Sequence, residues 1–256
     1  MSDFDRNVAS ARPYGADRAV AIDAGLRAYM IRVYNTMALG VALTGVVSWL
    51  TYQIAGGDAI RVAGGQLTGL TAFGQALFNP ITTIVLFLAT LGFVFFISFR
   101  IQTLSVGTAN VLFYVYSAVM GLVVSSIFLV YTGQSITRVF FITAASFGAL
   151  SLYGYTTQRD LGPMGAFLFM GLIGLILASI VNIFLASSGL SFVISVVGVL
   201  VFAGLTAYDT QRIKEMYDVN DDGSVAGRKA IMGALTLYLD FINMFLMLLR
   251  LFGDRR

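Results

Sequence analysis

The stretch LTLYLDFINMFLMLLRLF, residues 235–252, is an almost unbroken apolar run with one aspartate, Asp240, near its middle. A helix rises about 1.5 Å per residue, so ~20 apolar residues cross the ~30 Å hydrocarbon core of a bilayer. A charged carboxylate at mid-membrane costs about 2.5–3.5 kcal/mol on insertion scales. The stretch therefore predicts a membrane-spanning helix and makes Asp240 a candidate functional residue.

The whole chain has the composition of a membrane protein. Of its 256 residues, 58% are hydrophobic and 11% are charged, whereas soluble domains are roughly 25% charged. We predict an all-α membrane protein with a polar N-terminal tail, residues 1–30, and a seven-helix transmembrane domain, residues 31–256. The tail lacks the pattern of a cleaved signal peptide. The predicted transmembrane helices are residues 34–54, 81–99, 107–131, 137–155, 162–186, 190–208 and 230–252.

The linker of residues 55–80 is rich in Gly, Thr and Gln, and we expect an irregular loop with a short surface helix. Elsewhere basic residues gather before the first predicted helix and after the second, fourth and sixth, while the opposite loops hold only Arg61 and Arg138. The positive-inside rule therefore predicts a cytoplasmic N-terminus. The C-terminal tail conflicts with this rule, because it carries Arg250, Arg255 and Arg256. Either the last segment is re-entrant or the tail crosses against its charge, and we expect a full crossing.

Two residue types are absent from the chain. Without Cys there are no disulfides and no thiolate metal sites, and without His the usual base of a nucleophilic dyad is missing. We expect no enzymatic activity. An intramembrane aspartyl protease would also use two aspartates, but the YD and LYLDF contexts differ from the Gly-x-Gly-Asp turn of that class. The net charge of +3 is scattered at the ends of apolar segments, so no nucleic-acid partner is expected.

Three charged residues are candidates for chemistry. Asp240 shares a helix face with Thr236 and Asn243, so this partly polar stripe should face protein or water. A neutral Asp240 that holds two helices together by hydrogen bonds is the structural alternative. Asp209, in LTAYDTQRIK, is expected one residue past the sixth helix. The alternative to a functional role is that Asp209 is a solvated carboxylate paired with Arg212. For Arg100, in FFISFRIQ, the alternative is a topology anchor whose long side chain extends to the membrane surface.

The segment DVNDDG, residues 218–223, matches the first half of a calcium-binding loop. The twelfth position of such a loop should be a bidentate Glu, and here it is Lys229. We expect a solvated acidic linker, with a weak cation-concentrating mouth as the alternative.

Two motifs, YDTQRIK (residues 208–214) and LTLYLDFINMFLMLLRLFG (residues 235–253), resemble the paired signature of the Bax inhibitor family. LRAYMIRVYN and FFISFR, at the first and second helices, also fit. The resemblance implies six helices around the last one, with a pore or cavity closed on the cytoplasmic side. It implies that Asp209 and Asp240 form a proton-sensing pair that gates a calcium leak, with Arg100 as the latch. Tyr208 adds a polar neighbour. The short loops and the resemblance favour a bacterial inner membrane.

Two carboxyl groups within hydrogen-bond reach in a low-dielectric site share a proton, which would make Asp240 tolerable in the membrane. We expect no resident cofactor. Calcium is expected as a permeant ion, or as an ion bound by Asp209 and Asp240, and the other expected partners are protons and the lipid bilayer. The alternative function is a non-conducting regulator that binds other membrane proteins, such as a protease or a stress- or death-pathway partner. Ion flux in liposomes that contain only this protein would distinguish the two.

Overall fold

The computed structural model describes residues 14–63 and 66–256, and these are predominantly helical. Among them, seven helices are long and apolar enough to cross a membrane, which confirms the predicted fold class. A short helix, α5 (Ile127–Val130), follows the third of these helices. The seven are α1 (Tyr14–Ala55), α3 (Pro80–Arg100), α4 (Val106–Val124), α6 (Gly133–Thr156), α7 (Gly162–Leu185), α8 (Ser188–Glu215) and α9 (Gly223–Phe252).

Most of these helices begin directly at a polar residue that caps the first turn. The capping side chain accepts a hydrogen bond from a backbone N–H group that has no partner inside the helix. This chemistry lets short loops join long helices. The caps are Asn79 for α3, Ser105 for α4, Thr132 for α6, Ser187 for α8 and Asp222 for α9.

Several helix boundaries differ from the prediction. The third predicted helix ends at Val124 instead of residue 131, and the last begins at Gly223 instead of residue 230. The first helix begins at Tyr14, so the predicted tail is helical from that residue on, and residues 1–13 lie outside the described residues. The sixth predicted helix, α8, continues past residue 208 to Glu215. The prediction was wrong there because falling hydropathy marks the end of the apolar part of a helix, while Gln, Arg, Lys and Glu continue a helix readily. Asp209 therefore lies inside α8.

The linker contains the expected short helix, α2 (Ala72–Leu77), and a short 3-10 turn, η2 (Gly57–Ala59). Between them lies a small antiparallel hairpin of β1 (Arg61–Ala63) and β2 (Gln66–Thr68), with Val62 paired to Leu67. The sequence did not predict this hairpin, because three-residue strands are too short to show an alternating pattern.

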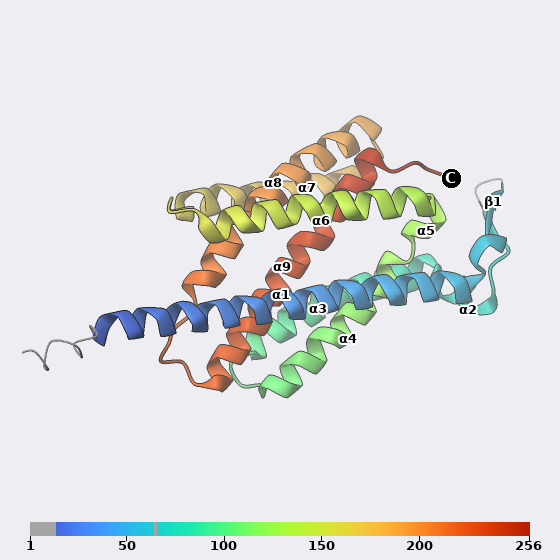
Figure 1. Cartoon of the computed structure of the whole chain (residues 1–256). Coiled ribbons are helices and arrows are strands. Elements are labelled where there is room, and N and C mark those ends of the chain that lie inside the picture. Colours follow the sequence, from blue (N-terminus) through green and yellow to red (C-terminus); the bar gives the residue numbers. More distant parts are fainter. Residues whose placement is uncertain (1–13, 64–65) are drawn as a thin grey trace, which may run out of the picture.

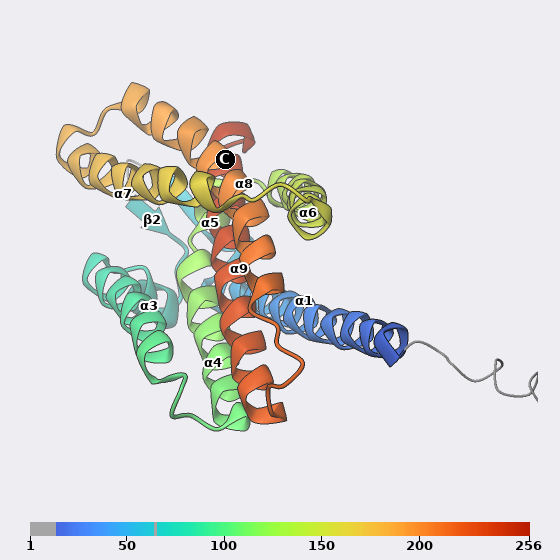
Figure 2. The same cartoon turned by 90° about the vertical axis from the view of Figure 1, so that its left-hand side faces the viewer.

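Helix α9 runs through the middle of the molecule (Figures 1 and 2). It packs against α8, α1, α6 and α4, whereas α3 packs mainly on α4 and α7 mainly on α8. Figure 2 shows α3 and α7 on the outside. Leu237, Tyr238 and Met244 of α9 are almost fully buried. The predicted arrangement of six helices around one is not seen directly in these contacts, since four helices make the main contacts with α9.

The last helix, α9, is continuous from Gly223 to Phe252. After it ends, the tail lies against the start of α6 and the short helix α5. The backbone N–H of Thr132 donates to the carbonyl of Asp254 (3.0 Å), and that of Arg256 donates to the carbonyl of Val130 (2.9 Å). The N–H of Asp254 donates to Ser135 Oγ (2.8 Å). The two ends of α9 therefore lie at opposite ends of the molecule, as a full crossing requires (Figure 1).

Candidate functional site

Asp240 lies inside the bundle, with 4% of its surface exposed. Its Oδ2 atom is buried and accepts no hydrogen bond from a hydroxyl, amide or cationic donor among the described residues. The polar residues on the same helix face do not supply one. Thr236 Oγ1 donates to the carbonyl of Met232 (3.1 Å), and Asn243 Nδ2 donates to that of Leu239 (2.9 Å). Since an uncompensated charge is costly there, the arrangement needs a partner from another helix.

The group that α8 presents to Asp240 is a second carboxyl group. Asp209 is half-buried on α8, and the side chains of Asp209 and Asp240 are close enough to interact across the α8–α9 interface. The positive charge of Arg212, one turn further along α8, also acts on Asp209. Arg212 Nη1 donates a long hydrogen bond to the Tyr208 hydroxyl (3.4 Å). The structure thus places Asp209 and Asp240 on two helices that pack against each other, with Tyr208 next to Asp209.

Glycines allow α8 and α9 to approach closely on both sides of Asp240. A Cβ atom on Gly233 of α9 would lie 2.9 Å from Ile213 Cγ2, and one on Gly198 of α8 would lie 3.0 Å from Met247 Cγ. Gly233 and Met247 are each two helical turns from Asp240, so these contacts are on its face of α9. This close packing fixes the depth at which the two carboxyl groups meet.

A chain of hydroxyl groups joins α1, α6 and α8 at Thr210, the residue after Asp209. The Tyr34 hydroxyl of α1 is 2.6 Å from Ser151 Oγ of α6, which is 2.9 Å from Thr210 Oγ1 of α8. Ser151 and Thr210 are buried. Because Thr210 follows Asp209 directly, this chain holds the Asp209 segment of α8 against α1 and α6.

Further contacts fix the end of α8. Gln211 Oε1 accepts from the N–H of Leu161 (2.8 Å), and its Nε2 donates to the carbonyl of Arg159 (2.8 Å). Lys214 Nζ donates to the carbonyl of Tyr155 (2.9 Å). The polar YDTQRIK segment therefore binds the α6–α7 connection.

Arg100 lies apart from this site. It is exposed in the last turn of α3, and no hydrogen bond or ion pair among the described residues joins it to Asp209 or Asp240. Its role as a latch stays a prediction.

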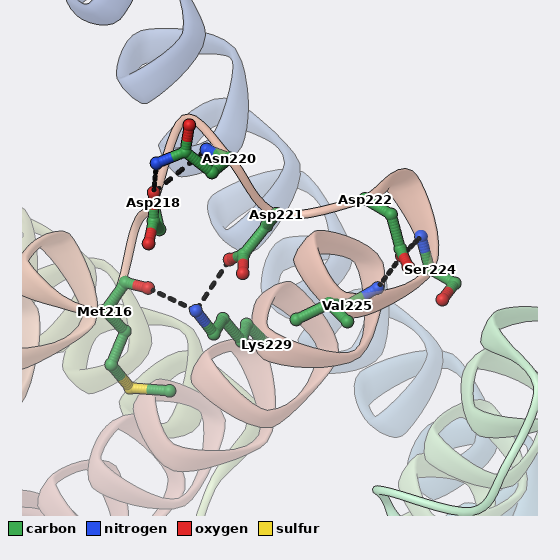
Figure 3. A network of polar contacts seen from close by, with 8 residues as sticks. All are labelled: Met216, Asp218, Asn220, Asp221, Asp222, Ser224, Val225 and Lys229. Atoms are coloured by element: carbon green, nitrogen blue, oxygen red, sulfur yellow. Dashed lines mark hydrogen bonds and ion pairs between the residues drawn. The ribbon is translucent and has the colours of Figure 1, made fainter.

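The acidic segment between α8 and α9 has its own partners (Figure 3). Lys229 Nζ donates to Asp221 Oδ2 (2.6 Å) and to the carbonyl of Met216 (3.0 Å). Asp218 Oδ1 accepts two hydrogen bonds from Asn220. Asp222 caps α9. The ammonium group of Lys229 thus interacts with two oxygen atoms of the segment, and we describe it as an internally cross-linked loop between the helices that carry the two aspartates.

No group of three or more acidic side chains that could hold a metal ion occurs within residues 14–63 and 66–256. Calcium takes 6–8 oxygen ligands, and Asp209 and Asp240 would supply only part of such a set.

Comparisons with known proteins identify the family of the chain. The family model described as inhibitor of apoptosis-promoting Bax1 matches residues 26–256. This chain belongs to the Bax inhibitor family. It is 48% identical to the inner membrane protein YbhL of Escherichia coli K12, over 94% of this chain and 97% of that protein. An uncharacterized protein of Rickettsia prowazekii is also 48% identical, over 91% and 92%.

In this member of the Bax inhibitor family, sequence reasoning selected the two carboxylates but missed their supports. Tyr34, Ser151, Thr210 and Gln211 were not selected, because hydroxyl and amide residues are common in membrane helices and their partners are distant in sequence. The only available signal was that Thr210 and Gln211 belong to the YDTQRIK motif.

Proposed function

We propose that this chain is a pH-sensitive calcium leak channel gated by Asp209 and Asp240. The observation that carries the proposal is the buried Oδ2 of Asp240, which has no conventional donor and has a second carboxyl group beside it. A hydrogen bond between two carboxyl groups requires that one of them be protonated. The proposed closed state therefore contains one proton for the two groups.

Loss of this proton would leave two negative charges between α8 and α9. Two unit charges about 4 Å apart repel by about 4 kcal/mol at an effective dielectric constant of 20. A two-state equilibrium moves from 1:99 to 99:1 with about 5.5 kcal/mol, so one protonation event is of the right size to bias a gate. A calcium ion that passes the two groups would offset the same repulsion.

The charges of two arginines would set the balance of this gate. Arg212 acts on Asp209 and offsets part of the charge of the ionised pair. Arg100 is proposed to hold the closed state as a latch, in an arrangement that brings the end of α3 to α8. Among the relatives, one from Escherichia coli carries the name inner membrane protein. We place this chain in a bacterial inner membrane, with the N-terminus in the cytoplasm.

Calcium flux into liposomes that contain only this protein tests the proposal. Asp209→Asn and Asp240→Asn should each flatten the pH dependence of the flux, because an amide does not titrate. Arg100→Ala should raise the flux at pH values where the unmodified protein is closed. Asp218→Asn is the control, because Asp218 is exposed in the loop and its carboxylate accepts hydrogen bonds from Asn220.

Two results would contradict the proposal. Unchanged pH profiles in both Asp→Asn variants would remove the proton-sensing role. Absence of flux in every protein, including the unmodified one, would favour the non-conducting regulator that binds other membrane proteins.

A further inference from the structure

A cavity of about 270 Å³ lies at the end of the molecule where α9 finishes. It is lined by Tyr52, Ile60, Arg61, Phe128, Leu129 and Arg256. Two of these six residues are arginines, contributed by the hairpin and by the C-terminal tail. We propose that this cavity binds the phosphate of an anionic phospholipid headgroup. This inference is independent of the proposed channel function.

Within residues 14–63 and 66–256, each guanidinium group uses only some of its donors. Arg256 Nη1 donates to the Tyr52 hydroxyl (2.8 Å), and Arg61 Nη1 donates to the carbonyls of Asp58 and Ile60. A guanidinium carries five N–H donors, so most of those on each arginine are not used in these bonds. Arginine binds phosphate through two parallel N–H groups. Two arginines at one cavity therefore match the oxygens of a phosphate.

Little negative charge opposes these arginines. Asp58 Oδ1 is 3.9 Å from Arg256 Nη2, and the Asp58 side chain is 89% exposed. An ion pair so long and so exposed to water contributes little. Two arginine side chains line the cavity and one exposed carboxylate side chain lies near them, an arrangement of side chains that favours an anion.

The chain holds Arg256 in place at the cavity. Its guanidinium lies over the ring of Tyr52, 5.5 Å from the ring centroid. Its backbone N–H donates to the carbonyl of Val130, and Arg255 forms an isolated bridge with Tyr131. The Arg256 side chain is thus oriented by an aromatic ring and by backbone pairing. Ligand binding therefore loses little conformational entropy in this side chain.

The depth and the remaining lining favour a lipid. Tyr52 is in the last turn of α1, the level at which tyrosine meets the headgroups of a bilayer. Ile60, Phe128 and Leu129 add an apolar wall, and Phe128 stacks on Tyr52. The volume is slightly below the ~300–1,000 Å³ of pockets for larger ligands. A headgroup fits, with its acyl chains along the apolar surface of α1.

The single tryptophan provides the test. Trp49 is half-exposed on α1, about one turn from Tyr52. The full chain is placed in phosphatidylcholine vesicles with equal fractions of brominated phosphatidylglycerol or brominated phosphatidylcholine, and quenching of Trp49 fluorescence is measured. We expect a preference for phosphatidylglycerol on the order of tenfold, since each arginine near an anionic surface favours it. Equal quenching by the two lipids would overturn the proposal.

Substitutions of arginine test whether the preference for phosphatidylglycerol comes from the cavity. Arg61→Gln together with Arg256→Gln should abolish it, whereas Arg138→Gln should keep it, because Arg138 pairs with Asp254 and is not part of the lining. Arg61→Gln alone should weaken the preference without loosening the C-terminal tail. A preference that survives the double substitution would contradict the proposal. Loss of the preference on addition of inorganic phosphate would show a soluble-anion site and overturn the lipid assignment.

Discussion

A single hydroxyl group, that of Ser151, joins three helices. It is hydrogen-bonded to Tyr34 of α1 and to Thr210 of α8, while its own backbone belongs to α6. Hydrogen bonds between membrane helices are worth about 0.6 kcal/mol on average, and a buried group left without a partner costs more.

Ser151→Ala should therefore lower the free energy of unfolding by about 1 kcal/mol, because two interhelical bonds are lost and two hydroxyl groups lose a partner. Ser195→Ala is the matched control, because Ser195 is equally buried but donates within its own helix, to the carbonyl of Ser191. Unfolding in a dodecyl sulfate titration, followed by circular dichroism, measures both. Equal losses in the two variants would argue against an interhelical role for Ser151.

Asp222 connects the acidic loop to α9 in a pH-dependent way. Hydrogen bonds from the Ser224 side chain and from the backbone N–H groups of Val225 and Ser224 lower the pKa of Asp222. A carboxyl group whose pKa is lower in the folded state stabilises the fold above its unfolded pKa. This contribution is lost as the pH falls through the folded pKa.

The first turn of α9 should accordingly fray in acid. Hydrogen-exchange protection factors at Ser224 and Val225 should fall as the pH drops below the normal range of an aspartate. Asp222→Asn keeps a capping oxygen and should remove this pH dependence, since Asn caps helices about as well as Asp. Asp222→Ala should fray the turn at every pH. A pH dependence that persists in Asp222→Asn would assign the effect to another group.

At the residue scale, the sequence could predict the carboxylates but not their neighbours. Asp240 was recognisable because a charge inside an apolar run is expensive, and Asp209 through its motif. Nothing local distinguishes Ser151 from the other serines, because its partners are 117 and 59 positions away. The buried Oδ2 of Asp240 is likewise a property of the packed bundle.

At the scale of elements, the contact between α6 and α8 depends on one glycine. A Cβ atom on Gly154 would clash with the backbone carbonyl of Ala207, two residues before Asp209. A Cβ atom on Gly148, in the same helix, would lie in open space. The two glycines offer a matched comparison, because alanine is the better helix former by about 1 kcal/mol at either position.

Gly148→Ala should raise the unfolding temperature slightly or leave it unchanged. Gly154→Ala should lower it, because the new methyl group meets backbone atoms that cannot rotate away, and overpacking of this kind costs roughly 1–3 kcal/mol. Thermal unfolding in detergent measures the difference. Similar unfolding temperatures would mean that α6 and α8 separate easily at this point.

Hydropathy predicted all seven long helices but placed some of their ends incorrectly. Helix α8 continues through YDTQRIK, and α1 begins at Tyr14, because a helical backbone tolerates polar residues that the hydrocarbon core does not. The arrangement of the helices was harder to predict. Helices α3 and α7 are strongly apolar, and only 11% of the residues in the apolar stretch of each are buried inside the protein, against 67% for α9. A helix that carries a carboxylate needs protein around it, whereas a wholly apolar helix can face lipid.

At the scale of the whole molecule, the seven crossings separate the loops into two sets. Residues 101–105, 157–161 and 216–222 connect helices at one end, and the hairpin, α2 and the tail lie at the other (Figure 1). Bonds of the tail to Val130, Thr132 and Ser135 place Arg255 and Arg256 in the second set. In the proposed orientation the basic tail would lie on the side opposite to the one that the positive-inside rule predicts, and its docking on α5 and α6 would hold it there.

The absence of cysteine allows this topology to be tested with single substitutions. Val219, Gln75 and Arg255 are exposed, and each is replaced by Cys in turn. An impermeant maleimide applied to intact spheroplasts should label Gln75→Cys and Arg255→Cys. Val219→Cys should react only after permeabilisation, because the acidic loop is on the cytoplasmic side in the proposed orientation. Protection of Arg255→Cys together with labelling of Gln75→Cys would contradict the full crossing of α9 and the lipid site at its end.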